Sequence, residues 1–346
     1  MKSRIFALLI GAAATLVALV LVSAGGASNQ ATIKVADVTD IGGLNDKGFN
    51  HLSYVGLVRA QKKLGIKGRA YITKAASDRL PNITAAAQQG NQLVFGVGFN
   101  FFNSIGKVAK SFPKVKFATI DVPVAAVPEG KLPNLRGLIF KEQESGYLAG
   151  YIAGLEITRH PYKGKRIISA VGANKVPAII HFLAGYKAGA RKANRKVTVL
   201  EDYANDPTFA DQAKCKETTL NQIQQGSGIV FEAAGQCGLG GLNAAKQSGI
   251  WGIGVDADQG FLGSFMLTSA TKKVDVAVYK TIQAYKANPK GFKGGKDVVF
   301  SLKNGGVGYG KLSKKLSKAD RTYITTRVNR IAKLIAQGKI VPPSGD

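Results

Sequence analysis

The feature that most constrains the fold of this chain is a regular alternation of short β-branched runs with amphipathic helical stretches, which begins near residue 32. In the first half, strands are predicted at 33–38, 70–72, 92–95, 115–120 and 135–140, and helices at 48–64, 80–89 and 102–111. Such alternation is typical of a parallel sheet with helices on both faces. This half of the chain therefore predicts one doubly wound lobe.

A second series repeats the pattern. It predicts strands at 166–171, 197–201, 228–232 and 251–255, and helices at 145–156, 177–193, 210–224 and 239–247. A helix at 274–286, a strand at 298–302 and a helix at 322–337 follow. The length of 346 residues agrees with two domains, since a domain takes roughly 100–200 residues. We therefore predict an α/β protein with two doubly wound parallel-sheet lobes.

The N-terminus has the layout of a secretion signal. Lys2 and Arg4 precede an uncharged apolar run over 5–24, which ends in small residues up to Ala27. We expect residues 1–27 to be a signal peptide and the protein to be exported, to the periplasm, the cell surface or the exterior. Because the run approaches the roughly 20 residues that span a bilayer, retention as an uncleaved anchor is the alternative. No cysteine lies near the run, so we expect no lipid-anchor cysteine.

The chain has two cysteines, Cys215 and Cys237. Outside the cytoplasm a disulfide can persist. Cys215 falls in the first turns of a predicted helix and Cys237 just past the following strand, positions that share one edge of a parallel sheet. We predict a disulfide between them, and a pair of buried free thiols is the alternative.

Acidic, amide and aromatic side chains gather in the segments that directly follow predicted strands. In open parallel sheets, ligands bind at this carboxyl edge. The residues concerned are Asp40, Asn45, Asp46, Phe49, Asp121 and Asp256, with the glycines Gly98 and Gly235 in the same segments. Carboxylates accept hydrogen bonds, so this pattern favours a cleft for a ligand with hydroxyl or amine donors over a phosphate or DNA site.

The net charge of +27, from 48 Lys and Arg against 21 Asp and Glu, raises nucleic acid or an anionic surface as a partner. The basic residues fall on predicted helix faces such as 187–196 and 311–333, without the interleaved aromatic residues of a single-strand binder. The export signal also argues against a chromosomal role. We expect no nucleic acid partner and assign the charge to the exterior, where it would favour an anionic membrane or cell wall.

A series of motifs, in order over residues 33–308, resembles the basic membrane protein family. These are substrate-binding proteins of ABC importers and are related to purine-nucleoside receptors. The motifs are VTDIGGLNDKGFN at 38–50, FGVGF at 95–99, KEQESGYLAGYIAG at 141–154, GYKAG at 185–189, AAG at 233–235, GVDADQ at 254–259 and LTSATKKVDVAV at 267–278. The last helix and the tail lie outside the resemblance.

The resemblance implies a type I periplasmic binding protein, a monomer whose two lobes are joined by three hinge crossings. We place the crossings near Phe140, Thr268 and Lys296. Lobe 1 would then comprise 31–140 and 269–296, and lobe 2 would comprise 141–268 and 297–346. A nucleoside, most simply a purine nucleoside, would be held between the lobes and passed to an ABC permease with its ATPase.

The resemblance also implies roles for individual residues. Phe49 and Phe209 match the two aromatic residues that sandwich the base, with Tyr203 as a competitor for the second place. Asp40 matches the carboxylate that contacts the base, Asp256 the one that holds sugar hydroxyls, and Lys272 a ligand-contacting lysine. Gly235 allows close backbone approach, while Asn45, Asp46, Gly98 and Asp121 line the rim. The two cysteines stand where the family has glycine and a small polar residue.

Two other functions stay open at this stage. The run of Asp37, Asp40, Asn45 and Asp46 is similar to the calcium-binding opening of nucleoside hydrolases, in which carboxylates hold a cation that activates water. A sugar receptor of the same fold is the second alternative. The three histidines are dispersed, and no phosphate-cradling Gly-x-x-x-x-Gly-Lys-Ser/Thr motif occurs, so the glycine-rich stretch 305–310 is predicted to form turns. We therefore expect no catalytic residue, metal or cofactor.

Overall fold

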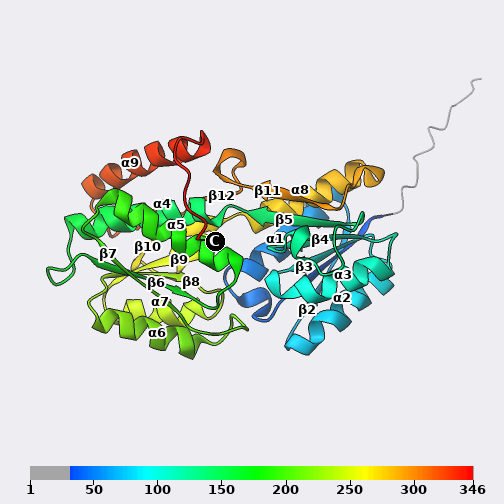
Figure 1. The fold of residues 1–346 in the computed structure, drawn as a ribbon, viewed down its shortest axis with the longest axis horizontal. Coiled ribbons are helices and arrows are strands. Elements are labelled where there is room, and N and C mark those ends of the chain that lie inside the picture. Colours follow the sequence, from blue (N-terminus) through cyan, green and yellow to red (C-terminus); the bar gives the residue numbers. More distant parts are fainter. Residues whose placement is uncertain (1–31, 346) are drawn as a thin grey trace, which may run out of the picture. The chain divides into compact units, whose positions relative to one another are not determined.

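Two six-stranded sheets organise the computed structural model, which describes residues 32–345 (Figure 1). The predicted signal peptide, 1–27, lies outside the described residues. One sheet has the order β11-β5-β4-β3-β1-β2 and is parallel throughout. The other has the order β12-β10-β9-β8-β6-β7, in which β12 alone is antiparallel. The two doubly wound lobes predicted from the sequence are confirmed.

The first lobe is built from the N-terminal third of the chain and two later elements. Its elements are β1 (Lys34–Thr39), α1 (Phe49–Leu64), β2 (Lys67–Ile72), α2 (Arg79–Gln88), β3 (Leu93–Val97), α3 (Phe102–Ser111), β4 (Lys116–Ile120), β5 (Leu135–Phe140), α8 (Val274–Ala287) and β11 (Lys296–Phe300). Helices α1 and α8 pack together on one face of the sheet, and α2 and α3 cover the other.

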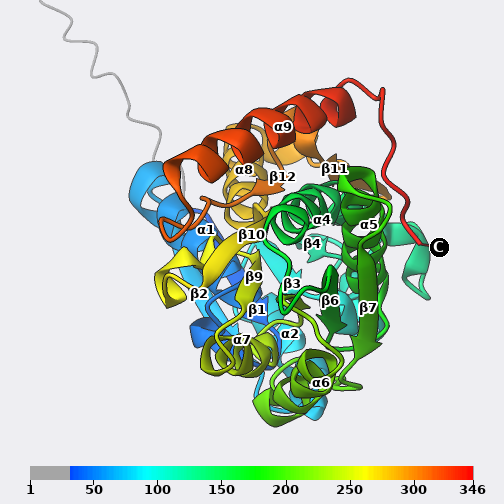
Figure 2. The same ribbon diagram turned by 90° about the vertical axis from the view of Figure 1, so that its left-hand side faces the viewer.

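The second lobe follows the same plan. Its elements are α4 (Glu142–Arg159), β6 (Ile167–Gly172), α5 (Pro177–Ala193), β7 (Thr198–Tyr203), α6 (Gln212–Gln224), β8 (Ile229–Ala233), α7 (Gly238–Gln247), β9 (Trp251–Asp256), β10 (Met266–Lys272), β12 (Val307–Tyr309) and α9 (Lys318–Ala336). Figure 2 shows α4 and α5 side by side, with α9 running close to α4. Helices α6 and α7 cover the opposite face.

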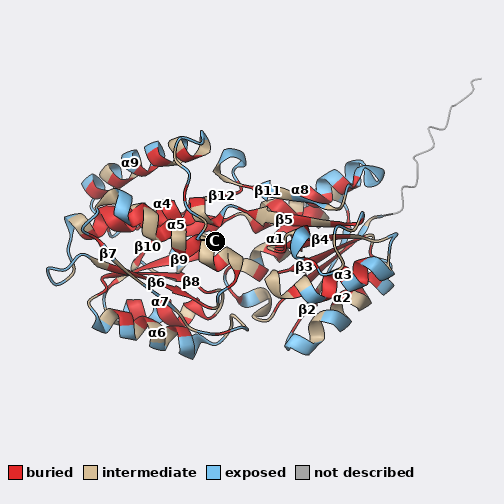
Figure 3. Ribbon diagram, in the orientation of Figure 1, coloured by how far each residue is buried: buried red, intermediate tan, exposed pale blue. Residues whose placement is uncertain are grey.

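Apolar side chains fill the layers on both faces of each sheet, so the central strands are buried over most of their length (Figure 3). Every residue of β3 and β8 is buried. This is the pattern expected of parallel strands that are covered twice. Among the described residues, no helix is long and apolar enough to span a membrane.

The chain crosses between the sheets after β5, after β10 and after β11. The first crossing follows Phe140, the last residue of β5. The predicted boundaries at 268 and 296 fall inside β10 and at the start of β11, so residues 269–272 pair with the second sheet and 297–300 with the first. Both strands continue beyond the expected hinge because their neighbours, β9 and β5, offer main-chain partners over that length.

Strand β10 was not among the predicted strands, and β12 lies in the glycine-rich stretch 305–310, for which turns were predicted. Strand β10 reads MLTSATK and is buried at every position, although its middle is polar. Two of its three hydroxyls have internal partners: Thr268 Oγ1 donates to the Gly310 carbonyl at 2.9 Å, and Ser269 Oγ accepts from the Gln259 N–H at 3.0 Å, whereas Thr271 Oγ1 has none. Hydroxyl pairing with the β12 segment thus replaces the apolar run by which a buried strand is recognised.

A seam of glycines brings α4 and α5 into close contact. Gly146, Gly150 and Gly154 on α4 face α5, and Gly185 and Gly189 on α5 face α4. A Cβ on Gly150 would overlap the carbonyl oxygen of Tyr186, which is backbone and cannot move aside. The glycines of the motif KEQESGYLAGYIAG at 141–154 therefore have a packing role in the second lobe.

We expect Gly150→Ala to lower the free energy of unfolding by about 1–3 kcal/mol, because overpacking at a backbone contact forces the two helices apart. Urea unfolding monitored by circular dichroism measures the change. Gly260→Ala is the control, since the nearest atom to its Cβ would lie at 3.6 Å. Equal stabilities for the two variants would contradict the close-packed seam.

One carboxyl group is buried inside the first lobe. Asp37 in β1 is 0% exposed, and Ser53 Oγ of α1 donates to its Oδ1 at 2.7 Å, while Oδ2 has no partner. Burial raises the pKa of Asp37 to about 7, against the smaller opposing effect of the Ser53 hydrogen bond. Between about pH 4 and pH 7, the folded chain thus holds a proton here that the unfolded chain has released.

This proton has a predictable effect on stability. Its contribution is complete below pH 4 and is lost as the pH rises through 7, so Asp37→Asn, which cannot ionise, should make the decline between pH 5 and pH 7 shallower by about 2 kcal/mol. Urea unfolding of both proteins at several pH values measures the difference. The exposed Glu217→Gln serves as control. Parallel pH profiles for wild type and Asp37→Asn would show that Asp37 is ionised throughout.

Candidate functional site

A cavity lies between the lobes, at the carboxyl ends of the strands of both sheets. Its empty volume, open mouth included, is about 690 Å³. The first lobe contributes the segments after β1, β3 and β4 and the start of α1. The second contributes the start of α5, the loop before α6, and the ends of β8, β9 and β10.

Most of the residues selected from the sequence meet at this cavity. Its lining includes Asp40, Asp46, Phe49, Gly98, Asp121, Phe209, Gly235, Asp256 and Lys272. Asn45 does not line it: the residue is exposed at the end of a short 3-10 helix, Gly43–Asn45. The segments that follow strands thus line the cavity, but the direction of each side chain depends on the turn that follows the strand.

Lys272, the last residue of β10, is the buried cation of the site. Its side chain is 1% exposed, and its Nζ lies 2.6 Å from Asp121 Oδ2 and 2.8 Å from Glu142 Oε1. Asp121 follows β4 in the first lobe and Glu142 opens α4 in the second, so the ammonium group joins the lobes. The rings of Phe140, Phe49 and Phe182 surround it, with centroids at 4.9, 5.1 and 5.9 Å.

The charges of this cluster are unequal, because three carboxyl groups share one lysine. Burial raises the pKa of Asp256 to about 7 and that of Asp121 to about 6, and in both cases Lys272 opposes the rise. The pKa of Glu142 shifts in the opposite direction. Burial alone would raise it, but Lys272 and His181 hold it below its usual value. Burial would likewise lower the pKa of Lys272, but the three carboxyl groups raise it. The cluster therefore has acceptors in excess and suits a ligand with donors.

Asp40 is held by two side chains, Arg79 and Asn100, that are not among the predicted site residues. Arg79 Nε of α2 donates to Oδ1 at 2.8 Å, and Asn100 Nδ2 donates to Oδ2 at 3.0 Å. The Ile41 N–H donates to Oδ1 as well, at 2.8 Å. Asn100 follows a predicted strand, which is a signal that could have found it. No sequence signal marks Arg79, since it reaches the site only through the packing of α2.

Asp46 acts mainly on the backbone. Its carboxylate accepts from the main-chain N–H groups of Gly48, Asn50 and His51 at 3.0, 2.7 and 3.1 Å. These groups belong to the first turn of α1, which has no intrahelical acceptors for them. Asp46 therefore caps the helix whose first residue is Phe49.

Two phenylalanines reach the cavity from opposite lobes, and each has a glycine beside it. Phe49 begins α1, and Phe209 lies in the loop between β7 and α6. A Cβ on Gly98 would lie 3.6 Å from Phe49 Cε1, and one on Gly235 would lie 3.3 Å from Phe209 Cβ. Both glycines have positive φ, 112° and 58°, so they supply turns that other residues rarely adopt and leave room for the rings.

Further polar contacts join the lobes at the edge of the cavity. Asn100 Nδ2 donates to the carbonyl of Pro207 at 3.3 Å, and Gln259 Nε2 donates to the carbonyl of Lys47 at 3.2 Å. Each contact pairs one lobe with the loop of the other. Together with Lys272 and Asp121, they hold the lobes around the enclosed space.

The carboxylates that were compared with a calcium site have other partners. Asp37 bonds Ser53, Asp40 bonds Arg79 and Asp46 caps α1. Within residues 32–345, no group of three or more His, Cys, Asp or Glu side chains is placed to hold a metal ion. The spacing that resembled a hydrolase therefore serves separate contacts here.

Comparisons with known proteins agree with this architecture. Residues 33–340 match the family described as ABC transporter substrate-binding protein PnrA-like. A Lactococcus lactis protein named ABC transporter nucleoside-binding protein BmpA is 33% identical over 99% of this chain and 100% of its own length. Basic membrane protein D of Borreliella burgdorferi is 31% identical over 87% of this chain and 85% of its own, and a Pyrococcus furiosus protein named an uncharacterised lipoprotein is 32% identical over 83% and 73%.

Among solved structures, an ABC transporter solute-binding protein from Aeropyrum pernix K1 superposes with a TM-score of 0.77, at 26% identity over 90% of this chain and 94% of its own. The two lobes thus have the type I periplasmic binding fold. The resemblance found in the motifs is confirmed, and the chain belongs to the basic membrane protein family of ABC transporter substrate-binding proteins.

Proposed function

We propose that this protein binds a nucleoside between its lobes and delivers it to an ABC permease and its ATPase. The observation that carries the proposal is the pair of phenylalanines, Phe49 and Phe209, which enter one cavity from opposite lobes. Flat rings on two lobes suit a flat base, because stacking on both faces links binding to closure of the hinge. The name of the Lactococcus relative points to the same class of ligand.

The polar groups around the cavity divide between the two parts of a nucleoside. Asp40, held by Arg79 and Asn100 in the first lobe, would accept from a ring or exocyclic N–H of the base. Asp256 and the Lys272 cluster would hold the sugar hydroxyls, for which paired acceptor oxygens are suited. A carboxylate acceptor suits any base with a ring or exocyclic N–H donor, in purines and pyrimidines alike, so the preference for a purine rests on the resemblance to purine-nucleoside receptors.

The site of action proposed here is outside the cytoplasm. The charged and apolar pattern of residues 1–27 supports export, and both cysteines of the chain are joined to each other at 215 and 237. The Pyrococcus relative is named a lipoprotein, whereas retention of this chain at a surface would rest on its net charge of +27.

Isothermal titration calorimetry with adenosine, guanosine, inosine, cytidine, D-ribose and D-galactose tests the proposal. Saturable one-to-one binding of a nucleoside, tightest for a purine, is the expected result. Binding of a sugar without binding of any nucleoside would contradict the proposal and indicate a sugar receptor. Incubation with inosine and calcium, followed by chromatography, should give no free hypoxanthine. Release of hypoxanthine would show that the protein is a nucleoside hydrolase.

Removal of one stacking ring should weaken binding strongly. Base stacking on an aromatic side chain is worth about 1–3 kcal/mol, so Phe49→Ala should raise the Kd for the nucleoside roughly 10- to 100-fold. The matched control is Phe261→Ala, because Phe261 is 64% exposed and does not line the cavity. An unchanged Kd for a folded Phe49→Ala protein would remove this ring from the site.

A further inference from the structure

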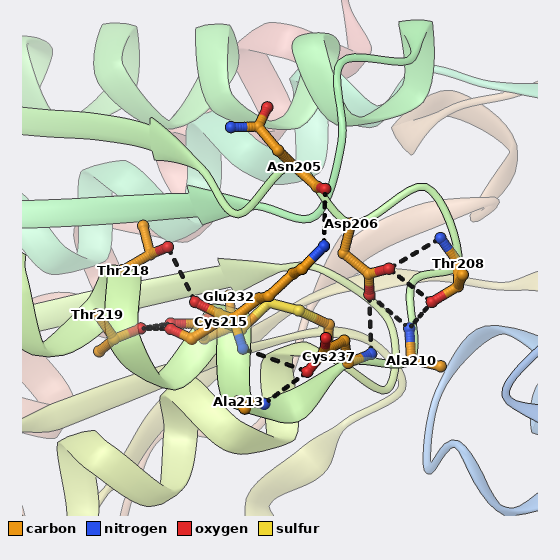
Figure 4. The surroundings of a disulfide bond; sticks show 12 residues. Asn205, Asp206, Thr208, Ala210, Ala213, Cys215, Thr218, Thr219, Glu232 and Cys237 are labelled. Carbon is orange, nitrogen blue, oxygen red and sulfur yellow. Dashed lines mark hydrogen bonds between the residues drawn. A yellow bond between two sulfur atoms is a disulfide. The ribbon is translucent and has the colours of Figure 1, made fainter.

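The disulfide between Cys215 and Cys237 lies directly behind the binding loop of the second lobe. Cys215 is in the first turns of α6 and Cys237 immediately precedes α7, with their Cα atoms 5.5 Å apart. Both side chains are fully buried in a cluster that also contacts Phe209. Figure 4 shows the bond beneath the loop that carries Asp206, Thr208 and Ala210.

The disulfide and one hydrogen bond together restrain the main chain at Phe209. The Cys237 N–H donates to the Phe209 carbonyl at 3.0 Å. Cys237 is bonded to Cys215, and the chain from Cys215 leads back through the start of α6 to Phe209. Phe209 is thus linked to Cys237 in two ways. Its carbonyl accepts a hydrogen bond from the Cys237 N–H, and the chain from Phe209 to Cys215 is joined to Cys237 by the disulfide.

Phe209 needs such a restraint because its backbone is strained. Its φ is 58°, a left-handed conformation that non-glycine residues rarely adopt and that persists only where the surroundings enforce it. Asp206 supplies part of the restraint: its Oδ2 accepts from the N–H groups of Ala210 and Asp211, each at 2.8 Å. Gly235, packed against the Phe209 carbonyl and Cβ, supplies another part.

We propose that the Cys215–Cys237 disulfide is a positioning element for the ligand site, which holds the Phe209 loop so that its ring faces the cavity. The expected effect of the disulfide on ligand affinity rests on the proposed function. Its expected effect on the Phe209 loop does not. Neither cysteine lines the cavity, so the disulfide acts through Phe209. Its removal should weaken nucleoside binding even though no contact with the ligand is lost.

A double-mutant cycle tests this route. Cys215→Ala with Cys237→Ala should raise the Kd for adenosine or guanosine about tenfold, a coupling of the size seen between contacting residues. In a Phe209→Ala background, where no ring remains to be positioned, the same two substitutions should change the Kd less than about twofold. Equal weakening in both backgrounds, or no weakening in the first, would overturn the proposal.

The variant Val328→Ala distinguishes a loss of positioning of Phe209 from a general loss of protein stability. Val328 is fully buried on α9, in the core on the opposite face of the second sheet. It should lower the melting temperature without changing the Kd; a Kd change as large as that of the cysteine variant would assign the effect to stability alone. If the double alanine variant does not fold, wild type refolded under reducing conditions takes its place with the same expectations.

Hydrogen exchange on ligand-free protein gives a readout that does not depend on nucleoside binding. The amides of Ala210 and Asp211, bonded to Asp206, should exchange about tenfold faster without the disulfide and at the wild-type rate in Val328→Ala. Unchanged exchange would overturn the positioning role. If wild type binds no nucleoside while exchange accelerates as expected, the proposed ligand is wrong and the role of the disulfide in the loop stands.

Discussion

The placement of one buried cation, Lys272, governs how the two lobes meet. A lysine that is removed from water needs carboxylate partners at short range, since desolvation would otherwise exceed what the fold can offset. The partners come from both sides: Asp121 ends a strand region of the first lobe, and Glu142 begins α4 just after the first crossing. The ion cluster is therefore both the junction of the lobes and the floor of the cavity, and the excess of carboxyl groups there sets the kind of ligand that the cavity favours.

The acidic and basic side chains of the protein occupy different regions of the structure. In the described residues ten Asp and Glu side chains are buried, whereas Lys272 is the one buried Lys or Arg. Of the nine described α-helices, seven have a Lys or Arg in the last turn, where a cation interacts favourably with the carbonyl end of the helix. Basic residues thus stabilise helix ends on the outside, while acidic residues build the interior site. Net charge alone pointed to nucleic acid; its distribution points to a small ligand inside and an anionic surface outside.

The sequence predicted the lobes and most of the site because both depend on local pattern. Strand and helix periodicity marked the layers, and the edge rule placed Asp40, Asp121 and Asp256 at one cleft. The pattern failed where tertiary contacts decide. Strand β10 lacks an apolar run and is tolerated in the interior because Thr268 bonds the residue after β12 and Ser269 bonds the segment after β9. Arg79 and Glu142 act through packing of α2 and α4, which no spacing rule reveals. Asn45 was misplaced because a short 3-10 helix turns its side chain to solvent.

Backbone strain connects these features. Six non-glycine residues among those described have positive φ, and three of them, Asp121, Phe209 and Asp256, line the cavity. Such conformations cost about 1–3 kcal/mol each and persist only where neighbouring contacts enforce them. Lys272 restrains Asp121 through their ion pair, and its charge acts on the buried Asp256; the disulfide, Asp206 and Gly235 restrain Phe209. The strained turns aim side chains into the cavity that relaxed turns would direct elsewhere. The ion cluster and the disulfide therefore play the same physical part on the two sides of the site: each holds a binding residue in a geometry that the local sequence alone would not adopt.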